Sequence, residues 1–285
     1  MWKTKLCLAA HYGNMDVNEQ IKLFRNIGFE GFFTSYDSDN LAQYRETAEK
    51  CGMYYQSVHA PFVRMNVMWR EGEEGISARD ELIKCVDDTA DIGVPIVVVH
   101  TYIGMGARKT DVPNEIGLGN FSAVVERAVK RNVKIAFENT EGEEFLEALM
   151  KHFKNVPQVG FCWDTGHEMC YNYSEDMMAL YGDRLIATHI NDNLGIRDIN
   201  GELTFHDDLH LLPFDGVADW EGIASRLNKY GYNGELTFEL NLNSKPSRYD
   251  NDKYRELSME RYVTEAYARA CRVATMKERL KKTQI

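Results

Sequence analysis

The chain has 285 residues, of which 44% are apolar and 27% are charged, and 33 Lys and Arg against 44 Asp and Glu leave a formal net charge of −11. A chain of this length can bury its core as two average domains or as one large α/β barrel. The acidic balance argues against a nucleic-acid partner, because such binders usually present a basic face, although a local basic groove stays compatible with it.

Eight short runs, almost continuously apolar, are predicted to be strands that are buried on both faces. In chain order these strands are Lys5–Ala10, Phe29–Ser35, Tyr54–Ala60, Pro95–Thr101, Val133–Asn139, Val159–Thr165, Leu185–Asn191 and Glu235–Asn241. Amphipathic stretches alternate with them and predict helices. The predicted helices are Asn14–Gly28, Leu41–Gly52, Glu74–Gly93, Phe121–Asn132, Glu143–Asn155, Ser174–Gly182, Trp220–Gly231 and Leu257–Lys282.

Eight strands that alternate with eight helices predict a (β/α)₈ TIM barrel, in one domain over residues 1–285. The alternative is an open doubly wound sheet, which alternates in the same way. That fold often carries G-x-G-x-x-G after its first strand, and no such motif is found here. In a barrel the long loops Pro61–Glu73, Tyr102–Asn120 and Asp192–Asp219 would lie on the catalytic face.

Compartment signals are few. No stretch approaches the ~20 apolar residues that a membrane span needs. The apolar run within Met1–Ala10 is shorter than the ~7–15 residues of a secretory signal. The six cysteines are scattered without a C-x-x-C pair, which argues against a disulfide framework or a zinc knuckle. We therefore expect a cytoplasmic protein with free thiols and no membrane partner, and a homo-oligomer stays compatible with the sequence.

Ionisable residues gather where predicted strands end. Of the eight histidines only His152 falls inside a predicted helix. The other seven lie at or just after the carboxyl end of a strand, and they are His11, His59, His100, His167, His189, His206 and His210. Glu138, Asp164 and Glu239 also end strands, and Asp208 lies in the loop after the seventh strand. A single strand-end histidine usually just hydrogen-bonds a carbonyl, but a buried unpaired carboxylate is expensive.

So many carboxylates and imidazoles at one barrel mouth predict a cation among them, most simply a divalent metal. Nitrogen and oxygen ligands suit Mn²⁺, Mg²⁺, Co²⁺ or Zn²⁺, and no organic cofactor is indicated. Cys162 lies two residues before Asp164, so alternation turns both side chains the same way. A thiolate ligand and simple core packing are both open for it, with core packing favoured.

With these residues in place, the chain resembles the xylose isomerase-like TIM barrel superfamily. That group includes sugar and sugar-phosphate isomerases and epimerases, and AP endonucleases of the endonuclease IV type. The segments that carry the resemblance are SVHAPF with His59, VVVHTY with His100, AFENTEG with Glu138, CWDTGH with Asp164 and His167, THINDN with His189, DLH with Asp208 and His210, and FEL with Glu239.

The resemblance implies two site patterns. In ketose epimerases the strand-end Glu, Asp, His and Glu bind one metal, which corresponds to Glu138, Asp164, His189 and Glu239. The endonuclease pattern adds ligands for a trinuclear zinc cluster, and His59, His100, His167, Asp208 and His210 match these, as further metal ligands or as substrate-binding groups. The ligand count alone therefore leaves both patterns open.

The surroundings favour the sugar enzymes. The endonucleases carry a DNA-penetrating loop after the second strand, where this chain has TSYDSDN with Asp37 and Asp39 and no Arg or Trp. They also have Arg inside the Asp-x-His motif, where this chain has Leu209. Acidic residues in place of a basic wedge would repel a polyanion. The segment LHLLPFDGVADWEGI is similar to the isomerase branch, except that Phe214 replaces the usual Gly and puts the role of Asp208 and His210 in doubt.

The resemblance implies chemistry at a carbonyl. A metal would polarise the substrate carbonyl and stabilise an enediolate, while Glu138 and Glu239 remove and return a proton from opposite faces. Return to the far face gives an epimer, and return to the adjacent carbon gives an aldose–ketose isomer. His167, Glu144 and Arg197 are expected to contact sugar hydroxyls.

Other side chains complete the expected site. Tyr12, Phe62, Tyr102 and Trp163 are candidates for an apolar wall or for core packing. The loop Gly104–Lys109 offers weak evidence for a phosphate site. The sequence thus predicts a small-molecule sugar partner, phosphorylated or not.

Three functions remain, in descending order of support. The first is a metal-dependent isomerase or epimerase of a sugar or sugar phosphate. The second is a nuclease of the endonuclease IV type with three zinc ions. The third is a non-catalytic barrel, which would retain no metal and would tolerate replacement of the strand-end carboxylates.

Overall fold

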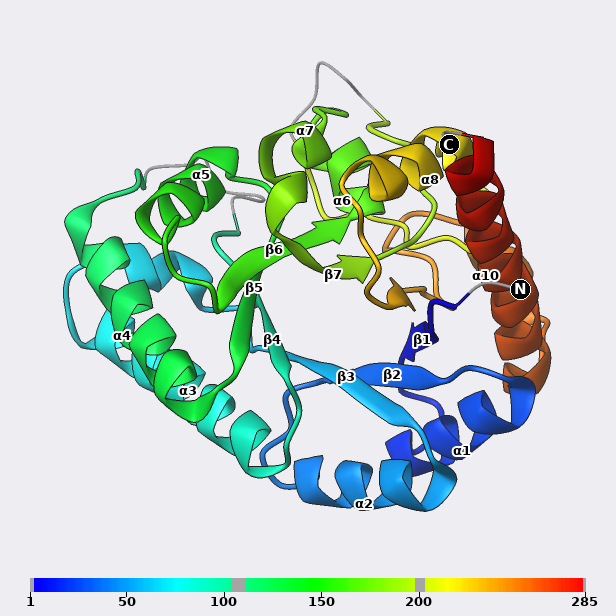
Figure 1. Ribbon diagram of the computed structural model, residues 1–285, viewed down its shortest axis with the longest axis horizontal. Coiled ribbons are helices and arrows are strands. Elements are labelled where there is room, and N and C mark those ends of the chain that lie inside the picture. The colour runs from blue at the N-terminus through cyan, green and yellow to red at the C-terminus, as the bar shows by residue number, and fades with distance from the viewer. Residues whose placement is uncertain (1–2, 104–110, 198–202, 284–285) are drawn as a thin grey trace.

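The computed structural model describes residues 3–103, 111–197 and 203–283. Its eight strands pair in parallel in the order β7-β6-β5-β4-β3-β2-β1-β8. Figure 1 shows the strands at the centre of the molecule with the helices arranged around them. The predicted (β/α)₈ barrel is therefore confirmed.

Each observed strand lies inside its predicted range. The strands are β1 Leu6–Ala9, β2 Gly31–Ser35, β3 Tyr54–His59, β4 Ile96–His100, β5 Lys134–Glu138, β6 Val159–Asp164, β7 Leu185–His189 and β8 Leu236–Phe238. The α-helices are α1 Val17–Ile27, α2 Leu41–Cys51, α3 Glu73–Asp91, α4 Glu115–Arg131, α5 Glu143–His152, α6 Thr165–Cys170, α7 Met177–Tyr181, α8 Trp220–Lys229, α9 Asp252–Arg255 and α10 Met259–Thr283. Two short 3₁₀ turns, η1 Met65–Trp69 and η2 Gly182–Arg184, complete the set.

The two-residue period of the strands divides the barrel interior into a lower and an upper level. The lower level is a small apolar cluster of Ile96, Val98, Ala136, Cys162 and Ala187. Two residues further along β4, β5, β6 and β7 stand His100, Glu138, Asp164 and His189. Alternation thus brings four ionisable side chains to the carboxyl end of the barrel, directly above an apolar plug.

The barrel closes between β7 and β8, and this seam differs from the other strand pairs. A single parallel bridge joins Ile190 to Phe238. The Ile190 amide donates to the Thr237 carbonyl at 2.8 Å, and the Glu239 amide donates to the Ile190 carbonyl at 3.2 Å. The Thr188 hydroxyl fills the gap, since it accepts from the Thr237 amide at 3.1 Å and donates to the Glu235 carbonyl at 3.2 Å. Closure excludes the open doubly wound sheet.

Some local predictions were wrong. His167 belongs to the short helix α6 instead of a loop, because the Asp164 carboxylate caps that helix by accepting from the His167 amide at 2.7 Å. Helix α4 begins at Glu115, six residues before its predicted start, since Asn114 caps it by accepting from the Gly117 amide. The predicted long loop after the third strand, 61–73, contains η1, whose Trp69 packs against Phe121 and Phe145.

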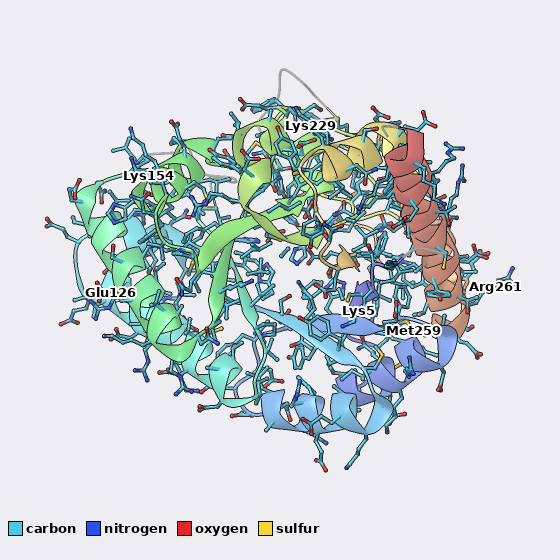
Figure 2. The ribbon with its side chains drawn as sticks, in the orientation of Figure 1. Lys5, Glu126, Lys154, Lys229, Met259 and Arg261 are labelled. Carbon is cyan, nitrogen blue, oxygen red and sulfur yellow. The ribbon has the colours of Figure 1, made fainter. Side chains whose placement is uncertain are left out.

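Charged side chains lie on the outer surface of the barrel. Figure 2 labels Glu126, Lys154, Lys229 and Arg261 around the periphery, and all four are exposed. All six cysteines are free, as expected. Among the described helices, none combines the length and the apolar character that crossing a membrane requires.

Candidate metal centre

The strand ladder sets the central ligands side by side. Register pairs His100 with Glu138 across β4 and β5, and Asp164 with His189 across β6 and β7. Glu239 follows β8 and enters from the other side of the seam. One ligand atom from each of Glu138, Asp164, His189 and Glu239 lies within 4.8 Å of the others. The structure therefore brings together the four residues predicted to share an ion.

Two carboxylates converge on one imidazole in this group. His189 Nδ1 lies 2.7 Å from Glu138 Oε1 and 2.9 Å from Glu239 Oε2. Glu138 and His189 have no exposed surface, whereas the Glu239 side chain is 15% exposed. Glu239 is thus the carboxylate that reaches the cavity above the group.

Two further groups flank the central one. His59 Nε2 and His100 Nε2 lie 3.3 and 3.1 Å from Glu138 Oε2, so Glu138 belongs to both groups. On the other side, one ligand atom from each of His167, Asp208 and His210 also lies within 4.8 Å of the other two. His210 Nε2 is 2.9 Å from one Asp208 oxygen, and His167 Nε2 is 3.6 Å from the other. All nine predicted ligands therefore meet at one barrel mouth.

Backbone carbonyls orient three of the imidazoles. The Nδ1–H groups of His59, His167 and His210 donate to the carbonyls of Ala60, Asn139 and Glu239 at 2.9–3.0 Å. A carbonyl only accepts, so each neutral ring turns the lone pair of its Nε2 toward the ligand groups. A second ring nitrogen anchored in this way is typical of metal-binding histidines.

Two asparagines hold Asp164. Asn191 Nδ2 donates to both carboxylate oxygens of Asp164 at 3.1 and 3.0 Å. Asn139 accepts from the Asp164 amide at 2.8 Å and donates to its carbonyl at 2.9 Å. These bonds fix the carboxylate before any ligand binds, so the geometry of the central group is preorganised.

The pKa directions show strong electrostatic coupling. Burial raises the pKa of Asp164, and the neighbouring carboxylates of Glu138 and Glu239 raise it further. Burial opposes charge on His189, but Glu138 and Glu239 outweigh it and raise the pKa of His189 well above its usual value. In the group of His167, Asp208 and His210, burial lowers the pKa of His210. The Asp208 carboxylate more than compensates and raises the pKa of His210 to about 9. The buried carboxylates thus draw positive charge to this mouth.

A cavity of about 580 Å³ opens above the ligand groups. Its lining includes His59, His100, His167, Asp208, His210 and Glu239. Phe62 and Tyr102 also line it, as predicted for an apolar wall. Tyr12 and Trp163 instead belong to the buried core, where Trp163 Nε1 donates to Glu168 and Tyr12 packs against Tyr262.

The other sequence candidates have different outcomes. Glu144 and Arg197 are absent from the described lining of this cavity, so their contact with substrate stays a prediction. The Gly104–Lys109 segment lies outside the described residues. Cys162 is fully buried, and its thiol lies within 4.8 Å of ligand atoms of Glu138 and His189. Burial raises its pKa well above the usual value, which favours the neutral thiol of the lower apolar level.

Sequence reasoning missed several residues of the cavity. Lys245 lines it and places Nζ 3.2 Å from Asp208 Oδ2. Phe205 forms part of the rim with 44% of its surface exposed. Glu141 lies three residues after Glu138, and Asn241 lies two residues after Glu239. This closeness to strand-end ligands is the one sequence signal that could have identified them.

A closed parallel barrel with acids and imidazoles at its carboxyl end places this chain in the class of TIM barrels, whose functional sites lie at that end. More specifically, the model of the family described as "Xylose isomerase-like TIM barrel" matches residues 19–260, and the chain belongs to that family.

Curated relatives match over part of their length. The chain is 34% identical over 208 residues to "Uncharacterized protein y4fM" of Sinorhizobium fredii, which covers 69% of the chain and 60% of that protein. It is 25% identical over 177 residues to "Probable endonuclease 4" of Staphylococcus aureus, which covers 56% of the chain and 59% of that protein. The chain thus spans about 60% of the length of both relatives.

Solved structures with the same fold include sugar epimerases. D-Psicose 3-epimerase from Clostridium cellulolyticum H10, solved with D-tagatose, has a TM-score of 0.70 at 16% identity and covers 95% of this chain and 99% of its own. IOLI protein with a bound zinc atom has a TM-score of 0.71 at 16% identity and covers 95% and 98%. At these identities the likeness establishes the fold alone.

Proposed function

We propose that this protein is a metal-dependent isomerase or epimerase that acts on a sugar or sugar derivative by moving a proton next to a carbonyl. The observation that carries the proposal is the convergence of Glu138, Asp164, His189 and Glu239 within 4.8 Å beneath a cavity of about 580 Å³. A cavity of this size suits a small molecule. The solved sugar epimerases of the same fold support the choice of substrate class.

The residues of the central group fit a divalent cation. Three carboxylates face one imidazole, so the central group keeps excess negative charge even when His189 is protonated. Buried His189 Nε2 also has no hydrogen-bond partner among the described residues. Oxygen and nitrogen donors of this kind suit Mn²⁺, Mg²⁺, Co²⁺ or Zn²⁺. When bound, such an ion would polarise the substrate carbonyl and stabilise the negative charge of the enediolate.

The chain's own carboxylates would move the proton. Glu239 lines the cavity, so its free oxygen is placed to remove a proton from the carbon next to the carbonyl. Glu138, whose carboxylate meets the same His189 Nδ1 as Glu239, would return a proton to the other face of that carbon. His167 lines the cavity and would bind substrate hydroxyls, while Phe62 and Tyr102 exclude water from one wall.

Exchange of a substrate C–H proton with solvent tests this proposal. In deuterated water the metal-loaded protein should incorporate deuterium into a ketose, and Glu239→Gln should slow incorporation about 10²–10⁴-fold, the usual contribution of a general base. Glu235→Gln, at the opposite end of the same strand, is the matched control and should retain the rate. Full-rate exchange in Glu239→Gln would exclude the mechanism.

A second function is favoured by one specific observation, the sharing of Glu138 between ligand groups. With His59, His100, His167, Asp208 and His210, the mouth holds three adjoining sets of ligand atoms. Such an array suits several zinc ions and cleavage of a phosphodiester, as in an AP endonuclease. Leu209 weighs against this, because it is fully buried and offers nothing to a phosphate.

Metal stoichiometry separates the two functions. The nuclease requires about three ions per chain and cleavage of abasic-site DNA that weakens steeply as salt rises. One ion per chain, measured by elemental analysis after removal of loosely bound metal, would exclude it. Three ions without DNA cleavage would leave the sugar enzyme with a larger metal centre.

A further inference from the structure

A second cavity adjoins the first on the β3 side of the barrel mouth. It has a volume of about 250 Å³ and shares Ser35, His59 and Phe62 with the main cavity. Its remaining wall comes from the segment after β3 and from helix α3. Because the two cavities have three residues in common, they border each other at the Phe62 ring.

Phe62 forms the partition between the two cavities. Its ring centroid lies 4.9 Å from that of His100 and 5.5 Å from that of His59. The side chain is 42% exposed, so part of the ring stays open to solvent beside His59 and His100. The Phe62 carbonyl accepts from the Met65 amide at 3.1 Å, so the turn into η1 holds the segment in place.

The outer cavity combines an apolar floor with a polar rim. Ala60 is buried beneath it, and Phe62 and Val63 are exposed at its side. Arg64 and Glu81 form the rim, with 3.8 Å between Arg64 Nη1 and Glu81 Oε2. Helix α3 fixes the guanidinium, which donates to the Ser77 hydroxyl and the Glu74 carbonyl at 3.2 Å. A pyranose ring matches this wall, because it has an apolar face of C–H groups and an edge of hydroxyls that bond to charged groups.

We infer that the substrate carries a second sugar ring, which binds in this outer cavity against Phe62, with its hydroxyl edge at the Arg64–Glu81 ion pair. This inference rests on the proposed function and extends its substrate class from monosaccharides to glycosylated ketoses. Glu138 Oε2 lies 3.3 Å from His59 Nε2, so His59 separates the reacting end from the outer cavity. The keto ring would therefore bind at Glu239, and the glycosyl group would extend past His59 and Phe62.

Solvent exchange compares the two substrate classes directly. The probes are D-fructose and four disaccharides in which a hexosyl group substitutes O3, O4, O5 or O6 of fructose, namely turanose, lactulose, leucrose and palatinose. For the metal-loaded protein we expect kcat/KM of the best disaccharide to exceed that of fructose at least tenfold. Phe62→Ala should lower this ratio about tenfold, and Glu81→Ala should lower it by a smaller factor, since each removes one wall of the outer cavity.

Leu180→Ala serves as the matched control, because Leu180 is a half-exposed apolar residue on α7 that lines neither cavity. It should leave the ratio unchanged. Fructose exchange that equals or exceeds disaccharide exchange would overturn the inference, as would a Phe62→Ala variant that slows both substrates equally. These results leave the proposed function intact. By contrast, absence of exchange with every ketose would reject the proposed function, and the inference with it.

Calorimetry supplies a readout that does not depend on turnover. Metal-loaded Glu239→Gln should bind the preferred disaccharide at least tenfold more tightly than fructose, and the added Phe62→Ala change should remove that difference. If metal-loaded Glu239→Gln binds the disaccharide and fructose with equal affinity, the inference of a second sugar ring is also overturned.

Discussion

The lower and upper levels of the barrel interior lie only two residues apart on the same strands, yet their chemistry is opposite. On β5 the lower level has Ala136 and the upper level has Glu138, and both are fully buried. The lower side chains are neutral and need only close packing. The upper carboxylates are held by histidines, asparagines and, we propose, an ion. The difference shows that depth along the barrel axis, rather than burial, decides whether a charge is tolerated.

A carboxylate moved to the lower level should break this arrangement and give the largest effect on stability. Ala136→Asp places a charge among Val98, Cys162 and Ala187, without a partner. We expect the free energy of unfolding to fall by about 4 kcal/mol or more, because an uncompensated buried charge is costly. Urea denaturation measures the loss. Ala136→Asn, of similar volume without the charge, should cost less, and equal losses would show that charge is not the cause.

Adding a metal ion to the protein tests the upper level, because the ion should stabilise the carboxylates there. Protein stripped with a chelator should gain about 2.7 kcal/mol when the ion is present at 100 times its dissociation constant. For a chain of 285 residues this corresponds to a rise in Tm of roughly 4–5 °C, which calorimetry can follow. Asp164→Asn should reduce the shift, whereas Glu235→Gln should retain it. If none of Mn²⁺, Mg²⁺, Co²⁺ and Zn²⁺ raises the Tm of the native chain, the proposed centre does not bind them.

The smallest effect concerns a carboxylate that protein groups neutralise without an ion. Burial raises the pKa of Asp215, but hydrogen bonds from Tyr254, Arg269 and Lys253 outweigh burial and hold that pKa below its usual value. The stabilisation is therefore present above about pH 4 and is lost as pH falls through the folded-state pKa. We expect these contacts of Asp215 to contribute about 1 kcal/mol to the free energy of unfolding, because the carboxylate is partly exposed.

Unfolding free energies measured from pH 6 to pH 2 test this contribution. The native chain should lose more stability over that range than Asp215→Asn, which lacks the titrating group. Parallel curves for the two proteins would contradict the assignment.

The fold was predictable because its pattern is local. Apolar runs of strand length, separated by amphipathic helices, specify the eight units, and the strand-end positions of Glu138 and His189 predicted that both lie at the barrel mouth. The shape of the site depends on contacts between distant segments instead. Lys245 meets Asp208 across 37 positions of sequence, and no local pattern encodes that distance. The sequence analysis also missed helix α6. Its N-cap is Asp164, which was interpreted only as a residue of the site.

The single bridge between β7 and β8 has a consequence for how ion binding and chain closure depend on each other. His189 ends one side of that joint and Glu239 follows the other, with 2.9 Å between their nearest nitrogen and oxygen atoms. An ion held by both residues would connect β7 to β8 across the closure of the barrel. Ion binding would then stabilise the closure between β7 and β8. Local opening of that closure would in turn release the ion, because it would move His189 away from Glu239.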